Sequence, residues 1–372
     1  MSEQKILVES PGRINLIGEH IDYNGGKVLP AAINKKIIIK LESIKGLECY
    51  VESRTINKSF KLNLNSLLKR DNGWENYIIG VLKVLIEKRN FLISGFNCII
   101  DGDLPIGAGI SSSSSLICGL IKGLNDLNNL NLKNDDIIDI ARDIEHNFIG
   151  LKGGIMDQFT ILYGKKNKLL FLNCKTRDYI FIDSDFGEYK FLLLNTNIDH
   201  KLSDSSYNER VIECQNALKI IKNRRQDIDY LCDVSEKILL QFNNLIDKKE
   251  FNRAKFVIQE NERVINSVKK IKESKIKDFG MLMYESHYGL KELYEVSCDQ
   301  LDFMVDFSKG YDYILGSRMM GGGFGGCTIN LIHSDFIDQY VEKISKEYYN
   351  EFDVHLTPIV TTISDGLNSY KK

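Results

Sequence analysis

Short runs of apolar and β-branched residues recur through the first hundred positions of the chain. They predict strands over 5–9, 37–41 and 96–100. Between the last two strands, the apolar residues of 77–87 recur at helical spacing and predict a helix. This order of elements favours a mixed α/β (α+β) fold, in which helices cover a sheet.

A strand, a turn and a helix are predicted in succession between residues 96 and 127. The strand leads into the Gly/Ser segment 104–116, after which leucines recur at helical spacing (Leu116, Leu120, Leu124 and Leu127). Gly107 and Gly109 let the backbone approach an anion, and the amides of Ile110, Ser111, Ser112 and Ser113 would point at it from a helix start. The segment therefore predicts a phosphate site. No G-x-x-x-x-G-K-[ST] string is present, which excludes an ordinary P-loop.

The remaining pattern divides the chain in two. A helix is predicted from Asn134 or Asp135, with one apolar face made by Ile137, Ala141, Ile144 and Phe148 and bordered by Glu145. Segments 159–162 and 169–172 are expected to form a hairpin. Strand 190–195 then opens a second half of charged helices and late strands at 328–332 and 356–363. We expect an N-terminal domain over 1–187 and a C-terminal domain over 188–372.

Composition narrows the class of protein. The 372 residues are 43% hydrophobic and 27% charged, with a formal net charge of −2, so no overall field favours nucleic acid or an anionic membrane. No apolar run approaches the roughly 18 residues of a membrane span, and we expect a cytoplasmic protein that acts as a monomer. The eight cysteines form no C-x-x-C pair and the six histidines show no ligand spacing, which favours reduced thiols and argues against structural zinc.

The segment PGRINLIGEHIDYNGG, residues 11–26, concentrates charge and glycine. Glu19, His20 and Asp22 offer hydrogen-bond acceptors and a ring that can donate or accept, all close together on a glycine-rich turn. Such a set suits a small polyhydroxylated ligand better than an apolar one.

This segment resembles the signature of galactokinases, within a group of small-molecule kinases that also includes homoserine, mevalonate and N-acetylgalactosamine kinases. LPIGAGISSSSSL (104–116) resembles the phosphate-binding loop of that group, and MMGGGFGGC (319–327) resembles its C-terminal glycine-rich motif. GIMDQF (154–159) and SHYGLKELYEVSCDQLD (286–302) agree with it. The resemblance covers nearly the whole chain and implies a two-lobed fold with the active site in the cleft between the lobes.

The resemblance implies ATP-dependent phosphorylation of D-galactose to galactose 1-phosphate, with Mg²⁺ as cofactor. It places Asp157 as the general base and Arg13 beside it, where the guanidinium keeps the carboxylate ionised but a weak base. Sugar-binding positions match Glu19, His20, Asp22, Gly154 and Tyr207. ATP would meet Gly107, Gly109 and residues Ile110 to Ser113, and Mg²⁺ would be held by Ser113 and Glu145. Trp74 aligns with a residue near adenine, although a core tryptophan fits the sequence equally well.

Several points stay open at the level of sequence. The family usually has alanine where Ser114 stands, often glutamate at Ile117, and commonly threonine at Met320. Gly321, Gly323 and Gly326 fit G-x-G-x-x-G, but the strand pattern after them does not fit a dinucleotide fingerprint, which opens a helix. A kinase for N-acetylgalactosamine or another hexose, and a galactose-sensing regulator without catalysis, remain alternatives.

Overall fold

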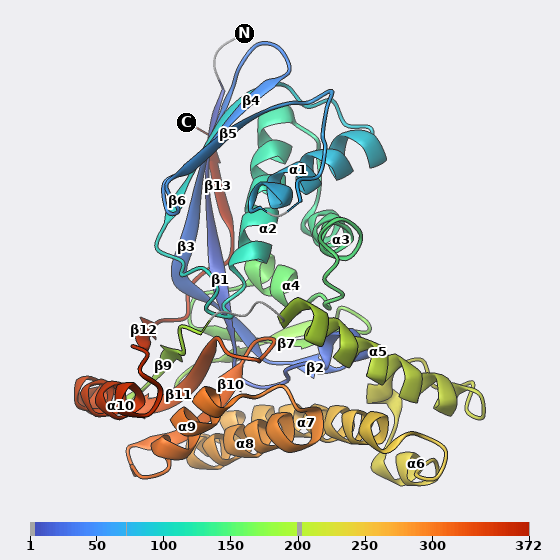
Figure 1. Cartoon of the computed structure of the whole chain (residues 1–372), viewed down its shortest axis with the longest axis vertical. Coiled ribbons are helices and arrows are strands. Elements are labelled where there is room, and N and C mark those ends of the chain that lie inside the picture. The colour runs from blue at the N-terminus through green and yellow to red at the C-terminus, as the bar shows by residue number, and fades with distance from the viewer. Residues whose placement is uncertain (1–3, 72, 199–202, 372) are drawn as a thin grey trace.

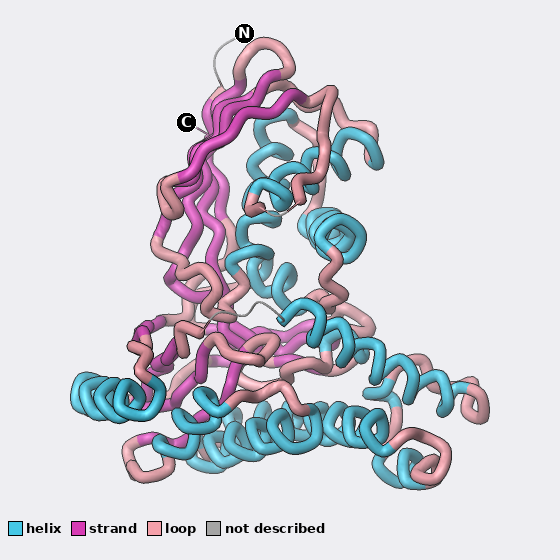
Figure 2. The backbone as a smooth tube through the Cα atoms, in the orientation of Figure 1, coloured by secondary structure: helices cyan, strands magenta, loops and turns pink. Residues whose placement is uncertain are grey.

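The computed structural model describes residues 4–71, 73–198 and 203–371. They form two lobes (Figure 1). The upper lobe in this view holds a large sheet with helices packed on one face. The lower lobe holds two smaller sheets with long helices beneath them, and Figure 2 shows the strands of both lobes converging where the lobes meet.

The upper sheet has six strands. In order across the sheet they are β13 (Asn368–Lys371), β1 (Lys5–Asn15), β3 (Pro30–Ser43), β6 (Phe96–Gly102), β4 (Glu48–Ser53) and β5 (Lys58–Asn63). Neighbours are antiparallel except β4 and β6, which run parallel. The strands predicted at 5–9, 37–41 and 96–100 are confirmed within β1, β3 and β6.

The helices of the upper lobe are α1 (Glu75–Lys83), α2 (Ser112–Asn128), α3 (Asn134–Asp143) and α4 (Met156–Tyr163), and wider π-type turns extend α1 over Val84–Lys88 and α3 over Ile144–Ile149. The helix predicted from about Ser113 is thus confirmed as α2. Its Gly119 and Gly123 face the sheet so closely that a Cβ would lie 2.9 Å from Ile39 Cδ1 and 2.5 Å from Leu41 Cδ1. This close packing fixes the position of α2 on the sheet, and with it the position of the Gly/Ser loop that leads into the helix.

The hairpin predicted at 159–162 and 169–172 is wrong. Residues 159–162 belong to α4, whereas β7 (Lys168–Asn173) pairs with β2 (Lys27–Val28) and β8 (Tyr179–Asp183) in a three-stranded sheet. A short apolar run that is buried on nearly all sides carries no period that separates strand from helix. The helix is what places Asp157 in a first turn, near the Gly/Ser loop.

The lower lobe contains most of the chain after residue 187. Its four-stranded sheet runs β10 (Ile314–Met320), β11 (Cys327–His333), β9 (Tyr189–Asn195) and β12 (Thr357–Thr361), all antiparallel. The helices of eight residues or more in this lobe are α5 (Ser203–Lys222), α7 (Lys248–Lys272), α8 (Ile276–Gly289), α9 (Asp299–Ser308) and α10 (Ile337–Phe352); α6 (Glu236–Leu240) is shorter. The strands predicted at 190–195, 328–332 and 356–363 correspond to β9, β11 and β12.

The chain passes between the lobes at both of its ends. After β1 it enters the lower lobe and forms β2 there, and after β12 it returns to the upper sheet as β13 beside β1 (Figure 1). The division at residue 187 stays a prediction. Among the described residues, no helix is both long and apolar enough to cross a membrane.

Candidate active site

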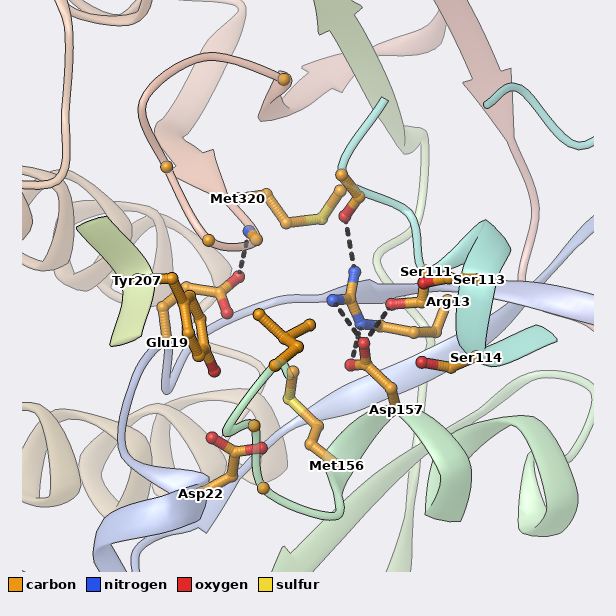
Figure 3. A pocket seen from close by; sticks show the side chains of 18 of the residues that line it. Arg13, Glu19, Asp22, Ser111, Ser113, Ser114, Met156, Asp157, Tyr207 and Met320 are labelled. Atoms are coloured by element: carbon orange, nitrogen blue, oxygen red, sulfur yellow. Dashed lines mark hydrogen bonds and ion pairs between the residues drawn. The ribbon is translucent and has the colours of Figure 1, made fainter. Parts of the chain in front are cut away.

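An ion pair between Arg13 and Asp157 lies at the centre of a polar cavity of about 270 Å³ between the lobes (Figure 3). Arg13 Nε donates to Asp157 Oδ1 at 2.6 Å, and Nη2 donates to Oδ2 at 3.2 Å. Arg13 Nη1 also donates to the carbonyl of Gly109 at 2.7 Å. Burial opposes the charged form of Arg13, but attraction to Asp157 and Glu19 outweighs it and raises the Arg13 pKa.

The Gly/Ser loop forms one wall of this cavity. Gly107 and Gly109 have φ of 76° and 70°, in the left-handed region that glycine adopts without strain. Ser111 is also left-handed, with φ of 62°, and its Oγ donates to Asp157 Oδ2 at 2.5 Å. Because α2 begins at Ser112, the free amides of its first turn point toward the cavity. Of the predicted ATP residues, Ile110 is buried instead, and its carbonyl accepts from the Arg13 amide.

Glu145 lines the cavity and is buried, with 5% of its surface exposed. Ser114 Oγ donates to its Oε1 at 2.7 Å, and Gln158 Nε2 donates to its Oε2 at 2.6 Å. Burial raises the Glu145 pKa to about 8, because the charged form loses water and lies near Asp157. The serine that contacts Glu145 is therefore Ser114, while Ser113, the residue predicted beside it, lines the cavity one position earlier.

The wall opposite the Gly/Ser loop is the signature loop, residues 18–27. Glu19 is nearly fully buried, and its Oε1 accepts from Arg318 Nη2 at 2.8 Å and from the Gly321 amide at 2.9 Å. Each hydrogen bond found for this carboxylate among the described residues engages Oε1. Figure 3 shows the carboxylate beside the cavity, which Glu19 lines.

His20 is held between this loop and the glycine-rich motif. Its Nε2 lies 3.1 Å from the carbonyl of Gly322, and its Nδ1 lies 2.8 Å from Tyr23 Oη. Burial lowers the His20 pKa to about 3, so the ring is neutral near pH 7. A carbonyl only accepts, so Nε2 carries the hydrogen and Nδ1 accepts from the Tyr23 hydroxyl.

Asp22 closes the lower end of the cavity. Burial, together with the negative charges of Asp157 and Glu19, raises its pKa to about 6. Gly154 lies against it: a Cβ there would come within 2.2 Å of Asp22 Oδ2, so no side chain fits. Tyr207, from α5, lines the same cavity, with its ring 5.2 Å from that of His20. The structure thus brings together the five residues predicted to bind sugar: Glu19, His20, Asp22, Gly154 and Tyr207.

A second, more apolar pocket of about 320 Å³ adjoins the first, and Gly107, Ser112 and Ser113 line both. Its lining includes Ile37, Ile56, Trp74, Tyr77, Ile100 and Leu116. Trp74 stands just before α1 and packs edge-to-face on Phe60, with ring centroids 5.3 Å apart. It therefore packs against the core and borders the pocket at the same time.

Sequence reasoning did not single out Arg318 or Gln158. Arg318 is fully buried in β10, and its guanidinium donates to Glu19 and to the carbonyls of Leu16, Asn15 and Met319. Gln158 was quoted only as part of GIMDQF. For Arg318 the available signal was an arginine beside the apolar residues Met319 and Met320, because a charge buried in such a segment needs partners.

Comparison with known proteins agrees with this architecture. The family models described as "GHMP kinases N terminal domain", "Galactokinase galactose-binding signature" and "GHMP kinases C terminal" match residues 76–165, 1–42 and 267–350. A galactokinase of Thermosipho africanus is 39% identical over 364 residues, covering 98% of this chain and 99% of the relative. A galactokinase of Clostridium tetani is also 39% identical, covering 91% and 87%.

Solved structures give the same result. The crystal structure of Lactococcus lactis galactokinase complexed with galactose has a TM-score of 0.92 and 32% identity, covering 98% of this chain and 95% of that one. Methanococcus jannaschii mevalonate kinase, at 23% identity and a TM-score of 0.68, shares the fold. The predicted two-lobed fold is confirmed, and the chain belongs to the galactokinase family of the GHMP kinases.

Proposed function

We propose that this protein transfers the γ-phosphoryl group of ATP to the anomeric hydroxyl of D-galactose, giving galactose 1-phosphate and ADP. The observation that carries the proposal is the position of the Arg13–Asp157 pair. It touches the Gly/Ser loop through Gly109 and Ser111, and it shares one cavity with Glu19, His20 and Asp22. The relatives named galactokinases and the galactose complex of the L. lactis enzyme support the choice of sugar.

Asp157 is proposed to accept the proton of the anomeric hydroxyl as that oxygen attacks the γ-phosphorus and the bond to the ADP oxygen breaks. Its side chain is 26% exposed, so a hydroxyl can reach it, while Arg13 is almost fully buried behind it. Arg13 balances the charge of Asp157 and of the transferring phosphoryl oxygens. A carboxylate paired in this way is a weak base, so positioning and charge carry much of the catalysis.

The other predicted residues take roles on either side of this pair. Ionised carboxylates only accept hydrogen bonds, so Glu19 and Asp22 are proposed to read the positions of sugar hydroxyls. The amides of the Gly/Ser loop are proposed to hold the ATP phosphates at the start of α2. The apolar pocket beside Trp74 adjoins that loop and suits a nucleobase. In this proposal the base and the sugar lie on opposite sides of the phosphates.

Mg²⁺ fits the oxygen donors around Glu145. Glu145 is a buried carboxyl group with Ser114 and Gln158 as its hydrogen-bond partners, and in the described chain Gln158 Oε1 is buried without a partner. A bound cation would lower the raised pKa of Glu145 and so favour the carboxylate. Proteins bind Mg²⁺ through one or two carboxylates plus substrate phosphates, so this small set of hard oxygens is sufficient. We propose Glu145 with Ser113 or Ser114 as the ligands. A bound ion would supply positive charge to the phosphate oxygens.

An ADP-release assay over a panel of sugars tests the proposal. Galactose should stimulate ADP release well above the sugar-free rate, whereas its C4 epimer glucose should not. A higher kcat/KM for N-acetylgalactosamine would favour the alternative hexose kinase. Binding of galactose without ADP release would favour the regulator.

A further inference from the structure

The signature loop is closed at its base by two neighbouring side chains of α7. Glu260 Oε1 accepts from the Gly18 amide at 2.9 Å, where the loop begins. Asn261 Oδ1 accepts from the Lys27 amide at 2.9 Å, where the loop ends. Between these two amides lie Glu19, His20 and Asp22, although both α7 residues belong to a helix more than 230 positions later in the chain.

The backbone at Gly18 is tightly packed and leaves no room for a side chain. Gly18 has φ of +105°, and a Cβ on it would lie 3.0 Å from the Lys27 carbonyl oxygen and 3.0 Å from Val264 Cγ2, also on α7. The two ends of the loop therefore touch each other and the helix at once. A loop whose ends are fixed in this way has little freedom to shift as a body relative to the cavity.

Glu260 is a charged group with a cost that the fold must offset. It is fully buried, and its carboxylate accepts from Ser286 Oγ at 2.7 Å and from Arg263 Nε at 2.7 Å as well as from Gly18. Its charge also acts on Arg318, the buried guanidinium that holds Glu19. A buried carboxylate persists only when hydrogen bonds and opposite charge compensate it, and here one of those bonds goes to the signature loop.

We propose that Glu260 and Asn261 are positioning residues for sugar binding: they fix the loop that presents Glu19, His20 and Asp22 to the cavity. Neither is among the residues that line the cavity, and the hydrogen bonds and ion pairs of the described residues join neither of them to the Gly/Ser loop or to Asp157. The inference rests on the proposed function, because it takes galactose as the ligand. Weakening the hydrogen bonds from the Gly18 and Lys27 amides to Glu260 and Asn261 should weaken sugar binding and leave ATP use nearly unchanged.

Glu260→Gln keeps the side-chain volume and an acceptor for Gly18 but removes the charge. A hydrogen bond to a charged acceptor corresponds to roughly a 10- to 100-fold effect on an equilibrium, so we expect the galactose KM to rise about tenfold, with ATP KM within about twofold. Asn261→Ala removes a neutral bond and should raise the galactose KM by about threefold. Glu262→Gln is the matched control, because Glu262 is two positions after Glu260 on the same helix but is exposed. It should change neither the galactose KM nor the ATP KM.

Deuterium uptake of the segment 16–28 gives a second readout that needs no activity. Uptake should be faster in Glu260→Gln than in Glu262→Gln. Because this measurement does not depend on turnover, it tests the anchoring of the loop separately from the proposed reaction. A folded Glu260→Gln with an unchanged galactose KM, or with galactose and ATP KM raised equally, overturns the proposal. If Glu260→Gln does not fold, an unchanged galactose KM in Asn261→Ala overturns it.

Discussion

The two loops that face each other across the cavity obtain their shapes in different ways. The Gly/Ser loop relies on its own residues, with left-handed Gly107, Gly109 and Ser111 leading directly into α2. The signature loop lies in the lower lobe and relies on residues far away in the chain: Arg318 of β10 holds Glu19, and Glu260 of α7 holds the Gly18 amide. The proposed phosphate site is therefore built largely from one short segment, whereas the proposed sugar site depends on how α7 and β10 pack against the signature loop.

The largest expected effect comes from Asp157, which lies between the two loops. Asp157 accepts hydrogen bonds from Ser111 of the Gly/Ser loop and from Arg13, and it lines the cavity proposed to hold the sugar. Asp157→Asn should lower kcat about 100-fold or more, the usual range for a lost general base, while galactose and ATP still bind. Steady-state kinetics beside calorimetry measures both. Turnover within a few-fold of wild type would remove Asp157 from the role of base.

A change confined to the signature loop should alter the choice of sugar. A site built to hydrogen-bond a hydroxyl can reject an analogue that misplaces it by up to about 10⁴-fold. Asp22→Ala should therefore reduce the galactose-to-glucose ratio of kcat/KM at least about tenfold, with ATP KM little changed. An unaltered ratio would show that Asp22 does not read the sugar.

The charge of Asp22 also predicts a pH dependence. Its pKa is raised to about 6 by burial and by Asp157 and Glu19, so the acceptor form is lost as pH falls through about 6. Below that value kcat/KM for galactose should fall by up to about tenfold per pH unit, and Asp22→Asn should lack this step. The sign for stability is opposite. Because the native pKa lies above the unfolded one, stability from Asp22 is lost as pH rises from about 4 to about 6. Asp22→Asn should then have a higher Tm at pH 7.5.

A substitution of Glu145 tests the proposed Mg²⁺ site beside the Gly/Ser loop. Glu145→Gln keeps the side-chain volume and one acceptor oxygen, and its new amide can donate to Ser114 Oγ, but the side chain can no longer ionise. We expect the Mg²⁺ concentration for half-maximal rate to rise at least about fivefold, because a neutral amide is a poor ligand for this ion. A Mg²⁺ titration at saturating galactose measures it. An unchanged midpoint would contradict the metal assignment.

The smallest effect is expected at the apolar pocket proposed to hold the nucleobase. Trp74→Phe keeps an aromatic ring against Phe60 but reduces the surface offered to the base. ATP KM should rise by about threefold, in line with the loss of part of an apolar contact, and galactose KM should not change. A change in galactose KM instead would mean that the two sides of the cavity are not independent.

The same contrast explains what the sequence could predict. The strands at 5–9 and 37–41 and the helix after Ser113 carry their own periodicity, and the Gly/Ser loop carries its own glycines. Arg318, Glu260 and Asn261, which hold the signature loop, stand in no sequence pattern that identifies them. Glu260 and Glu262 read alike in a charged helix, yet one is fully buried and the other exposed. Only the packing of α7 on the loop separates them. The hairpin at 159–162 failed because a fully buried apolar run has no period to read.

The position of the transferred phosphate tests the central claim most directly. Wild-type protein incubated with galactose, ATP and Mg²⁺ should give one new phosphomonoester, and its ³¹P resonance should couple to the anomeric proton of the sugar. The same reaction with Asp157→Asn should give little of it. A phosphate on the C6 oxygen, or ADP and inorganic phosphate without any phosphosugar, would contradict the account.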